Sequence, residues 1–166
     1  MKRALVVVRE KVILVISGPC GAGKTSAAQY LLDKHGMPGV PKYSDRPPRH
    51  DQTPAGGPGD ARYISSAEFD RRAAQPDAIV FQYGRNRYLF SDTEIRSLLA
   101  VNDAVSLVSG HRLVAETLSR WVRVVSIYIE ARPEVIDHRL HAAGYSDEMI
   151  VMRTGQIGRA SCRERV

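Results

Sequence analysis

Apolar and polar positions alternate along the chain in the way expected for successive strands and helices. Residues 11–17 form a short, β-branched, continuously apolar run, which predicts a strand buried on both faces of a parallel sheet. A glycine-rich stretch follows at once, and residues 26–35 then place alanines and leucines at helical spacing before Gly36. The pattern therefore predicts a strand, a glycine loop and a helix in direct succession.

The same alternation returns in the second half of the chain. Ser91 and Glu94 have the spacing of a capping box, which favours a helix start at that point. We expect three helices, over residues 91–100, 111–120 and 133–144, and two buried strands, over residues 104–108 and 122–129. Strands and helices that alternate at both ends of a chain predict an α/β fold with a parallel sheet and helices on both of its faces.

The middle of the chain departs from this pattern. Residues 38–60 are rich in proline, glycine and charge and are predicted to be mostly loop. Beyond them we expect a helix that Ser66 caps and that runs to residue 74, and three short strands, over residues 62–64, 78–82 and 87–90. Residues 43–90 are therefore predicted to form a small subdomain inserted into a core of residues 11–42 and 91–156.

Composition and charge narrow the class of protein. Hydrophobic residues make up 43% and charged residues 25%, as in a globular domain, and the net charge of +6 suits a ligand rich in phosphate. The sequence lacks the dense basic run that would indicate a nucleic-acid partner. It also has no apolar stretch long enough to span a membrane. Two cysteines far apart in the sequence favour a reducing, cytoplasmic setting.

The end of the chain differs from the rest. Residues 157–166 have no apolar periodicity, and they resemble the translation of a sequencing adaptor. We therefore expect residues 1–156 to be the native domain, cut short at its C-terminus, and residues 157–166 to be a non-native tail.

The glycine-rich stretch has the strongest chemical signal. It fits the pattern G-x-x-x-x-G-K-[ST], for which a chance match in a chain of this length has a probability of about 1% or less. Such a loop turns backbone N–H groups inward around a phosphate chain, and the helix that follows adds a positive potential. Lys24 is expected to reach the terminal phosphates of ATP, and the Thr25 hydroxyl to hold Mg²⁺. The predicted nucleotide-binding residues are Gly18, Pro19, Cys20, Gly21, Ala22, Gly23, Lys24, Thr25 and Ser26.

Four further stretches resemble guanylate kinases. Residues 43–49, Tyr-Ser-Asp-Arg-Pro-Pro-Arg, resemble that family's Thr-Thr-Arg-x-Pro-Arg, and residues 59–69 resemble its Gly-x-Asp-Tyr-x-Phe-Val-Ser segment with the following Glu-Phe. Residues 86–88 are similar to its Gly-Asn-x-Tyr-Gly, and residues 134–144 resemble its helix that ends in Arg-Leu-x-x-Arg-Gly. The resemblance extends over about residues 11–156 and implies a P-loop nucleotide kinase.

This resemblance implies transfer of the γ-phosphoryl group of ATP, with Mg²⁺, to a nucleoside monophosphate held by the insert. Arg46 and Arg49 would clamp the acceptor phosphate, which as a dianion needs no general base. Lys24, Arg139 and Arg153 would neutralise charge in the transition state. Gln82 and Tyr88 match further acceptor-binding positions of that family, and Tyr63 and Tyr88 are also candidates to stack on a base.

The chain also departs from the guanylate kinase pattern. Ala61 replaces a tyrosine, Gln82 replaces the glutamate that accepts hydrogen bonds from guanine, and residues 105–109 lack the family's Asp-x-Asp. The acceptor is therefore either a GMP-like nucleotide or another phosphorylated small molecule. Residues 109–112, Ser-Gly-His-Arg, loosely resemble the Asn-Gly-Ser-Arg of ribose 1,5-bisphosphate kinases. A nucleotide-binding module without turnover is the competing class.

Overall fold

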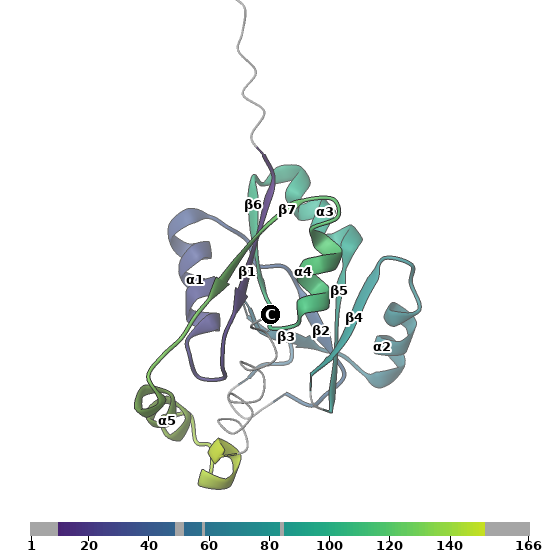
Figure 1. Cartoon of the computed structure of the whole chain (residues 1–166). Helices are drawn as coiled ribbons and strands as arrows, with labels where there is room; N and C mark the ends of the chain where they lie inside the picture. The colour runs from purple at the N-terminus through teal and green to yellow at the C-terminus, as the bar shows by residue number, and fades with distance from the viewer. Residues whose placement is uncertain (1–9, 49–51, 58, 84, 152–166) are drawn as a thin grey trace, which may run out of the picture.

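The computed structural model describes residues 10–48, 52–57, 59–83 and 85–151, which form two sheets lying beside each other and flanked by helices (Figure 1). The first sheet is parallel, with strand order β6-β1-β7. Its strands are β1 (Val12–Ser17), β6 (Ala104–Val108) and β7 (Arg123–Tyr128). The predicted α/β fold with a parallel sheet is thereby confirmed.

The second sheet is mixed and has the strand order β3-β2-β5-β4. Its strands are β2 (Lys42–Ser44), β3 (Ala61–Tyr63), β4 (Ala78–Tyr83) and β5 (Asn86–Ser91). Strand β2 is parallel to β3 and antiparallel to β5, which pairs with β4 as an antiparallel hairpin. The helices of the whole structure are α1 (Lys24–His35), α2 (Ser66–Ala73), α3 (Asp92–Val101), α4 (Arg112–Leu118) and α5 (Pro133–Ala142).

Strand β1 lies between β6 and β7, and both of its faces are covered by helices. Its apolar side chains alternate, so Ile13 and Val15 face α3 and α4, whereas Ile16 packs against Ala28 of α1. Ile13 and Ile16 are both fully buried. Helices thus cover both faces of the parallel sheet, as the continuously apolar sequence of β1 predicts.

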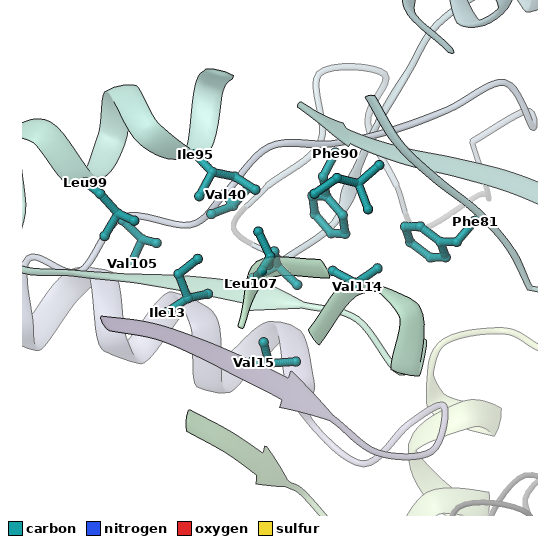
Figure 2. Packing of buried hydrophobic residues seen from close by; sticks show 12 residues of the cluster. Ile13, Val15, Val40, Phe81, Phe90, Ile95, Leu99, Val105, Leu107 and Val114 are labelled. Atoms are coloured by element: carbon teal, nitrogen blue, oxygen red, sulfur yellow. The ribbon is translucent and has the colours of Figure 1, made fainter. Parts of the chain in front are cut away.

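One hydrophobic cluster joins the two sheets. Phe81 of β4 and Phe90 of β5 stack with their ring centres 5.6 Å apart, and they pack with Leu107 of β6 and Val114 of α4 (Figure 2). Burying a large apolar side chain stabilises a fold by about 1.5–3 kcal/mol, so these contacts hold the sheets in a defined relation. Residues on the two sheets can therefore form one site.

The prediction that residues 38–60 are mostly loop is confirmed for the described part of that segment, and strand β2 is the exception that it missed. Tyr43 and Ser44 are buried, and the chain just before them also pairs with the first sheet. The Val40 N–H donates to the Ser106 carbonyl at 2.7 Å, and the Ser106 N–H donates to the Pro38 carbonyl at 2.9 Å. A three-residue strand is too short to show a periodicity, and it forms here because distant strands provide its backbone partners.

Strand β7 corrects the expectation of a buried strand over residues 122–129. Val125, Ile127 and Tyr128 are 37%, 43% and 49% exposed. In the described part of the chain β7 pairs with β1 alone. Helix α1 packs on β1 and β6 and does not cover these side chains of β7. The apolar sequence of β7 therefore predicts correctly that these residues form a strand, but it predicts wrongly that the strand is buried.

Two helix starts test the capping predictions. The Ser91 side chain accepts a hydrogen bond from the Glu94 N–H and caps α3, as predicted. Helix α2 is capped by Ser65, which accepts from the Glu68 N–H at 3.2 Å, so the prediction of Ser66 as the cap is wrong by one residue. Along the described segments, no helix combines the length and the apolar character needed to cross a membrane.

Candidate functional site

The glycine loop connects β1 to α1 at the carboxyl end of the parallel strands. Gly18, Gly21 and Gly23 have φ angles of +138°, +78° and +106°, a region that side chains other than glycine rarely adopt. A Cβ atom on Gly18 would also overlap the carbonyl oxygen of Ile129, which follows β7. The loop therefore depends on glycine both for its turns and for its close approach to the neighbouring backbone.

The first turn of α1 faces this loop. Gly23 is the N-cap residue and no side-chain hydrogen bond caps the helix, an arrangement typical of a helix N-terminus that faces an anion. The Lys24 ammonium folds back over the loop and donates to the Pro19 carbonyl at 2.7 Å. Thr25 and Ser26 are exposed at the start of the helix. The predicted glycine loop and helix are thus both present, with the Lys24 side chain folded back over the loop.

Helix α5 supports the loop from the side. Arg139 donates from Nη1 to the carbonyl oxygens of Gly21 and Ala22, each at 3.2 Å. Cys20 packs against the apolar cluster that contains Ile136 and Leu140. A surface depression of about 390 Å³ adjoins these contacts and is lined by Arg132, Glu134, Val135, His138 and Arg139. Arg139, which the sequence assigns to neutralising charge in the transition state, therefore lies beside the glycine loop and contacts its carbonyl oxygens.

A second group of polar side chains gathers on one face of the second sheet. Arg46 donates to the hydroxyl of Tyr63 at 2.8 Å, to the hydroxyl of Tyr88 at 3.2 Å and to Oε1 of Gln52 at 2.9 Å. Its guanidinium group also lies 4.7 Å from the centre of the Tyr63 ring. The segment after β2 and strands β3 and β5 thus bring together three residues that the sequence assigns to an acceptor, Arg46, Tyr63 and Tyr88.

Lys42 belongs to the same face, and the sequence analysis missed it. Its ammonium donates to the carbonyl oxygens of Gly59 at 3.2 Å and Val108 at 3.1 Å, and it lies 5.9 Å from the centre of the Tyr88 ring. Alternation along β2 places Lys42 on the same side as Ser44, which pairs in register with Tyr63 and Tyr88. That alternation was the available signal, but it could not be used because no strand was expected between residues 38 and 60.

The two groups meet between Thr25 and Asp60. The Thr25 Oγ1 atom lies 3.5 Å from Oδ1 of Asp60, at the outer limit of a hydrogen bond. The backbone before Asp60 is held close because Gly59 packs between β6 and α1. A Cβ atom on Gly59 would lie 2.7 Å from Val108 of β6 and 3.2 Å from Ala28 of α1. The glycine loop and the cationic face of the second sheet therefore form one continuous candidate site.

Comparison with known proteins identifies the fold. No protein-family model matches the chain, and no curated protein matches it by sequence. The structure is similar to the crystal structure of guanylate kinase from Anaplasma phagocytophilum, with a TM-score of 0.61 and 18% sequence identity over 93% of this chain and 74% of that one. The chain has a guanylate kinase-like fold. The strand, glycine loop and helix at its N-terminal end belong to this fold.

Within the guanylate kinase-like fold, the other predicted acceptor residues are not all in the cluster. Gln82 is exposed and pairs in register with Arg87, whereas Phe81 pairs with Tyr88, so Gln82 and Tyr88 point to opposite faces of the β4–β5 hairpin. Arg49 and Arg153 lie outside the described residues. His111 is at the N-cap of α4 without a side-chain cap bond, and its ring lies 5.4 Å from that of Phe81.

Ion pairs on the opposite face of the second sheet hold these strands in place. Arg87 pairs with Asp45 and with Asp70, and the hydrogen bond to Asp45 raises the pKa of the Arg87 guanidinium. Burial raises the pKa of the Tyr43 hydroxyl, and the hydrogen bond to Glu94 at 2.8 Å raises it further. Tyr43 therefore stays neutral over the physiological range and acts as a donor within the fold.

Metal-binding chemistry is limited in the described ranges. No group of three or more His, Cys, Asp or Glu side chains there could hold a metal ion. An exposed hydroxyl with one carboxylate beside it, as at Thr25 and Asp60, suits a hard cation that keeps most of its waters and also binds phosphate. Mg²⁺ bound to a nucleotide therefore fits the donor groups present, whereas a metal held by the protein alone does not.

Proposed function

We propose that this chain is an ATP-dependent phosphotransferase that uses Mg²⁺ and transfers the γ-phosphoryl group to a nucleoside monophosphate or a similar phosphorylated small molecule. The observation that supports the proposal is the meeting of two sites. A glycine loop suited to phosphate lies next to a cluster of cations and phenols. Thr25, at the start of α1, lies 3.5 Å from Asp60, which in turn contacts Gln52 of the cluster. Two adjacent anion sites are what transfer between two phosphorylated substrates requires.

The loop would bind the donor. Backbone N–H groups of the loop and of the first turn of α1 would surround the phosphates, and Lys24 would exchange the Pro19 carbonyl for phosphate oxygens. This exchange is favourable because a charged acceptor forms a stronger hydrogen bond than a neutral carbonyl. Thr25 would hold Mg²⁺, which when bound neutralises phosphate charge.

The cluster on the second sheet would bind the acceptor. Arg46 already lies in a fixed orientation, with its planar group held by Tyr63, Tyr88 and Gln52. A guanidinium group can bind a phosphate through two parallel hydrogen bonds, and Arg46 would exchange neutral acceptors such as the Tyr63 and Tyr88 hydroxyls for phosphate oxygens to do so. Lys42 adds a second positive charge on the same face. An acceptor phosphate is a dianion near neutral pH, so it can attack without a general base.

Charge on the transferred group would be neutralised from several sides. Lys24 is in the loop, and Arg139 reaches the loop carbonyls from α5, close to where the phosphates would lie. We assign Arg153 to the same role from its position in the guanylate kinase pattern. Phosphoryl transfer depends mainly on positioning and on such electrostatic stabilisation, because the protein itself makes no covalent bond.

A nucleotide-binding module without turnover is the second candidate. It is favoured by the end of β6, where Val108 and Ser109 offer no carboxylate, and by Gln82, which points away from Tyr88. Such a module would still use the loop to hold a nucleotide. The two candidates therefore differ in acceptor-dependent turnover and agree in ATP binding.

The test is to incubate the purified chain with ATP and Mg²⁺ and with one acceptor at a time from a panel of nucleoside monophosphates and sugar phosphates. Release of ADP that depends on one acceptor, and that the Lys24→Ala variant does not show, supports the phosphotransferase. Tight ATP binding without acceptor-dependent ADP supports the module. A chain that binds no ATP with or without Mg²⁺ contradicts both candidates.

A further inference from the structure

Asp60 is a carboxylate at the entrance of the glycine loop that the proposed reaction has not yet used. Its Oδ1 atom lies 3.5 Å from the Oγ1 atom of Thr25 and 3.4 Å from Nε2 of Gln52. Asp60 is partly exposed, so its carboxylate can contact solvent and a ligand. Its position is set by the packing of Gly59 against Thr25, Ala28 and Val108.

The separation of these two oxygens is close to that of two ligands of one cation. Mg²⁺ binds oxygen at about 2.0–2.1 Å with octahedral geometry, so adjacent ligands lie about 3 Å apart. The distance of 3.5 Å between Thr25 and Asp60 needs a shift of a few tenths of an ångström to match. A direct hydrogen bond at this length is weak, so an ion between the two oxygens would lose little by displacing it.

The need for such a carboxylate follows from the end of the neighbouring strand. In P-loop enzymes the hydroxyl of the loop and an aspartate together hold the Mg²⁺ of the nucleotide. Strand β6 lies directly beside β1, but it ends in Val108 and Ser109 and supplies no acidic side chain. Asp60 approaches the same hydroxyl from the second sheet, so it can supply the missing negative charge.

We propose that Asp60 and Thr25 together bind the Mg²⁺ of the bound nucleotide, an inference that rests on the proposed function. The carboxylate then comes from the segment before β3 and not from the strand beside β1. Asp60 is thereby a ligand of the metal as well as a contact between the two sheets.

The same arrangement links the metal site to the acceptor cluster. Gln52 donates to Asp60 through Nε2, and its Oε1 accepts from Arg46 at 2.9 Å and from the Tyr63 hydroxyl at 2.5 Å. A continuous chain of polar contacts therefore runs from Thr25 through Asp60 and Gln52 to Arg46. Metal binding at Asp60 would hold Gln52 and through it the orientation of Arg46.

The test measures Mg²⁺-dependent nucleotide binding without turnover. A non-hydrolysable ATP analogue is titrated into the wild-type chain and the Asp60→Asn variant by calorimetry, with and without Mg²⁺. Asp33→Asn is the matched control, because Asp33 is an exposed carboxylate on the same helix as Thr25 and contacts Gln29 instead. Thermal unfolding of all three proteins verifies that each is folded.

The expected result is that Mg²⁺ raises the nucleotide affinity of the wild type and of Asp33→Asn. In Asp60→Asn, the ratio of affinities with and without Mg²⁺ should be at least about tenfold smaller than in the wild type. Without Mg²⁺, Asp60→Asn should bind the analogue as well as the wild type or better, because a negative charge near the phosphates has been removed. Substitution of Mn²⁺ provides an independent measurement, since its electron paramagnetic resonance spectrum in the ternary complex should change in Asp60→Asn.

The outcomes separate the two levels of the proposal. A gain from Mg²⁺ that is equal in Asp60→Asn and the wild type, with an unchanged Mn²⁺ spectrum, overturns the role of Asp60 and leaves the proposed function intact. An equal loss in Asp33→Asn shows a general charge effect and also overturns that role. Absence of nucleotide binding by the folded wild type overturns the proposed function and, with it, this inference.

Discussion

Arg139 and Gly21 are 118 residues apart in the sequence, and the Arg139 side chain donates to the Gly21 carbonyl at 3.2 Å. This bond and its counterpart to Ala22 fix the glycine loop against α5. Replacing Arg139 with alanine should therefore loosen the loop and weaken ATP binding by about tenfold, since a hydrogen bond from a charged donor is worth about 1.5–3 kcal/mol. Calorimetric titration with ATP measures this.

Arg112→Ala is the control for the Arg139 variant. Arg112 is an exposed arginine that pairs with Glu116 on α4, so its loss should leave ATP binding unchanged. Equal affinities of the Arg139→Ala variant and the wild type would show that α5 does not support the loop.

Gly18 should be the least replaceable glycine of the loop. A methyl group there meets the Ile129 backbone at a φ angle of +138°, whereas Gly36 has a φ angle of +61° and nothing within 4 Å. We expect Gly36→Ala to lower the free energy of unfolding by about 1–2 kcal/mol, the cost of a left-handed residue with a side chain. Gly18→Ala should cost clearly more, as measured by urea denaturation, and equal effects would contradict the close packing of the loop on Ile129.

Lys24 is the residue on which ATP binding should depend most. Its ammonium lies over the loop, 2.7 Å from the Pro19 carbonyl, where the phosphates are proposed to bind. Lys24→Ala should reduce ATP affinity by at least about tenfold, because a hydrogen bond to a charged group is worth about 1.5–3 kcal/mol. Lys34→Ala, at the exposed end of the same helix, serves as the control. Unchanged ATP affinity in Lys24→Ala would refute the assignment of the loop.

Arg46 should affect the acceptor and spare the donor. Its guanidinium group is held by the Tyr63 and Tyr88 hydroxyls, so Arg46→Ala removes an oriented cation from the acceptor cluster. We expect kcat/KM for the acceptor to fall by at least about tenfold, equivalent to about 1.4 kcal/mol, with ATP affinity unchanged. Arg71→Ala, an exposed arginine on α2 that pairs with Glu68, should behave as the wild type. Steady-state kinetics with each substrate varied in turn distinguishes these outcomes.

His141 should make stability depend on pH. The hydrogen bond to Asp147, with that to the Asp137 carbonyl, raises the pKa of His141 above its usual 6.5. The charged imidazolium therefore stabilises the end of α5 fully below about pH 6.5, and this stabilisation is lost as the pH rises through the higher pKa of the folded state. The melting temperature of His141→Gln should fall below that of the wild type at pH 5.5 and approach it at pH 9. A pH-independent difference would rule out this role.

Much of the fold is predictable because its signals are local. The apolar run of β1 and the Ser91 cap of α3 each require only neighbouring residues, and the structure confirms both. Strand β2 was missed because its three residues are stabilised by β3 and β5, whose partners lie far along the chain. The exposure of β7 could not be foreseen, since apolar content indicates a strand without showing how many neighbours it has.

The candidate site divides in the same way. The glycine loop is recognisable from spacing alone, whereas Lys42, Gln52 and Asp60 become part of a site only after strand pairing. Gln82 is the opposite case. Its position in the sequence matches an acceptor-binding residue, but the strand pairing places it on the opposite face of the hairpin from Tyr88. A shift of one residue in a strand reverses the face of a side chain, and spacing in the sequence does not show it.

The sequence by itself determined the glycine loop and its helix, because the φ angles of glycine and the reach of Lys24 are properties of consecutive residues. The tertiary structure decided what faces that loop. Arg46 follows β2, Tyr63 and Tyr88 lie on β3 and β5, and Asp60 reaches Thr25 across 35 residues. Their meeting depends on backbone pairing and on a shared apolar core, both of which arise from contacts between segments that are distant in the chain.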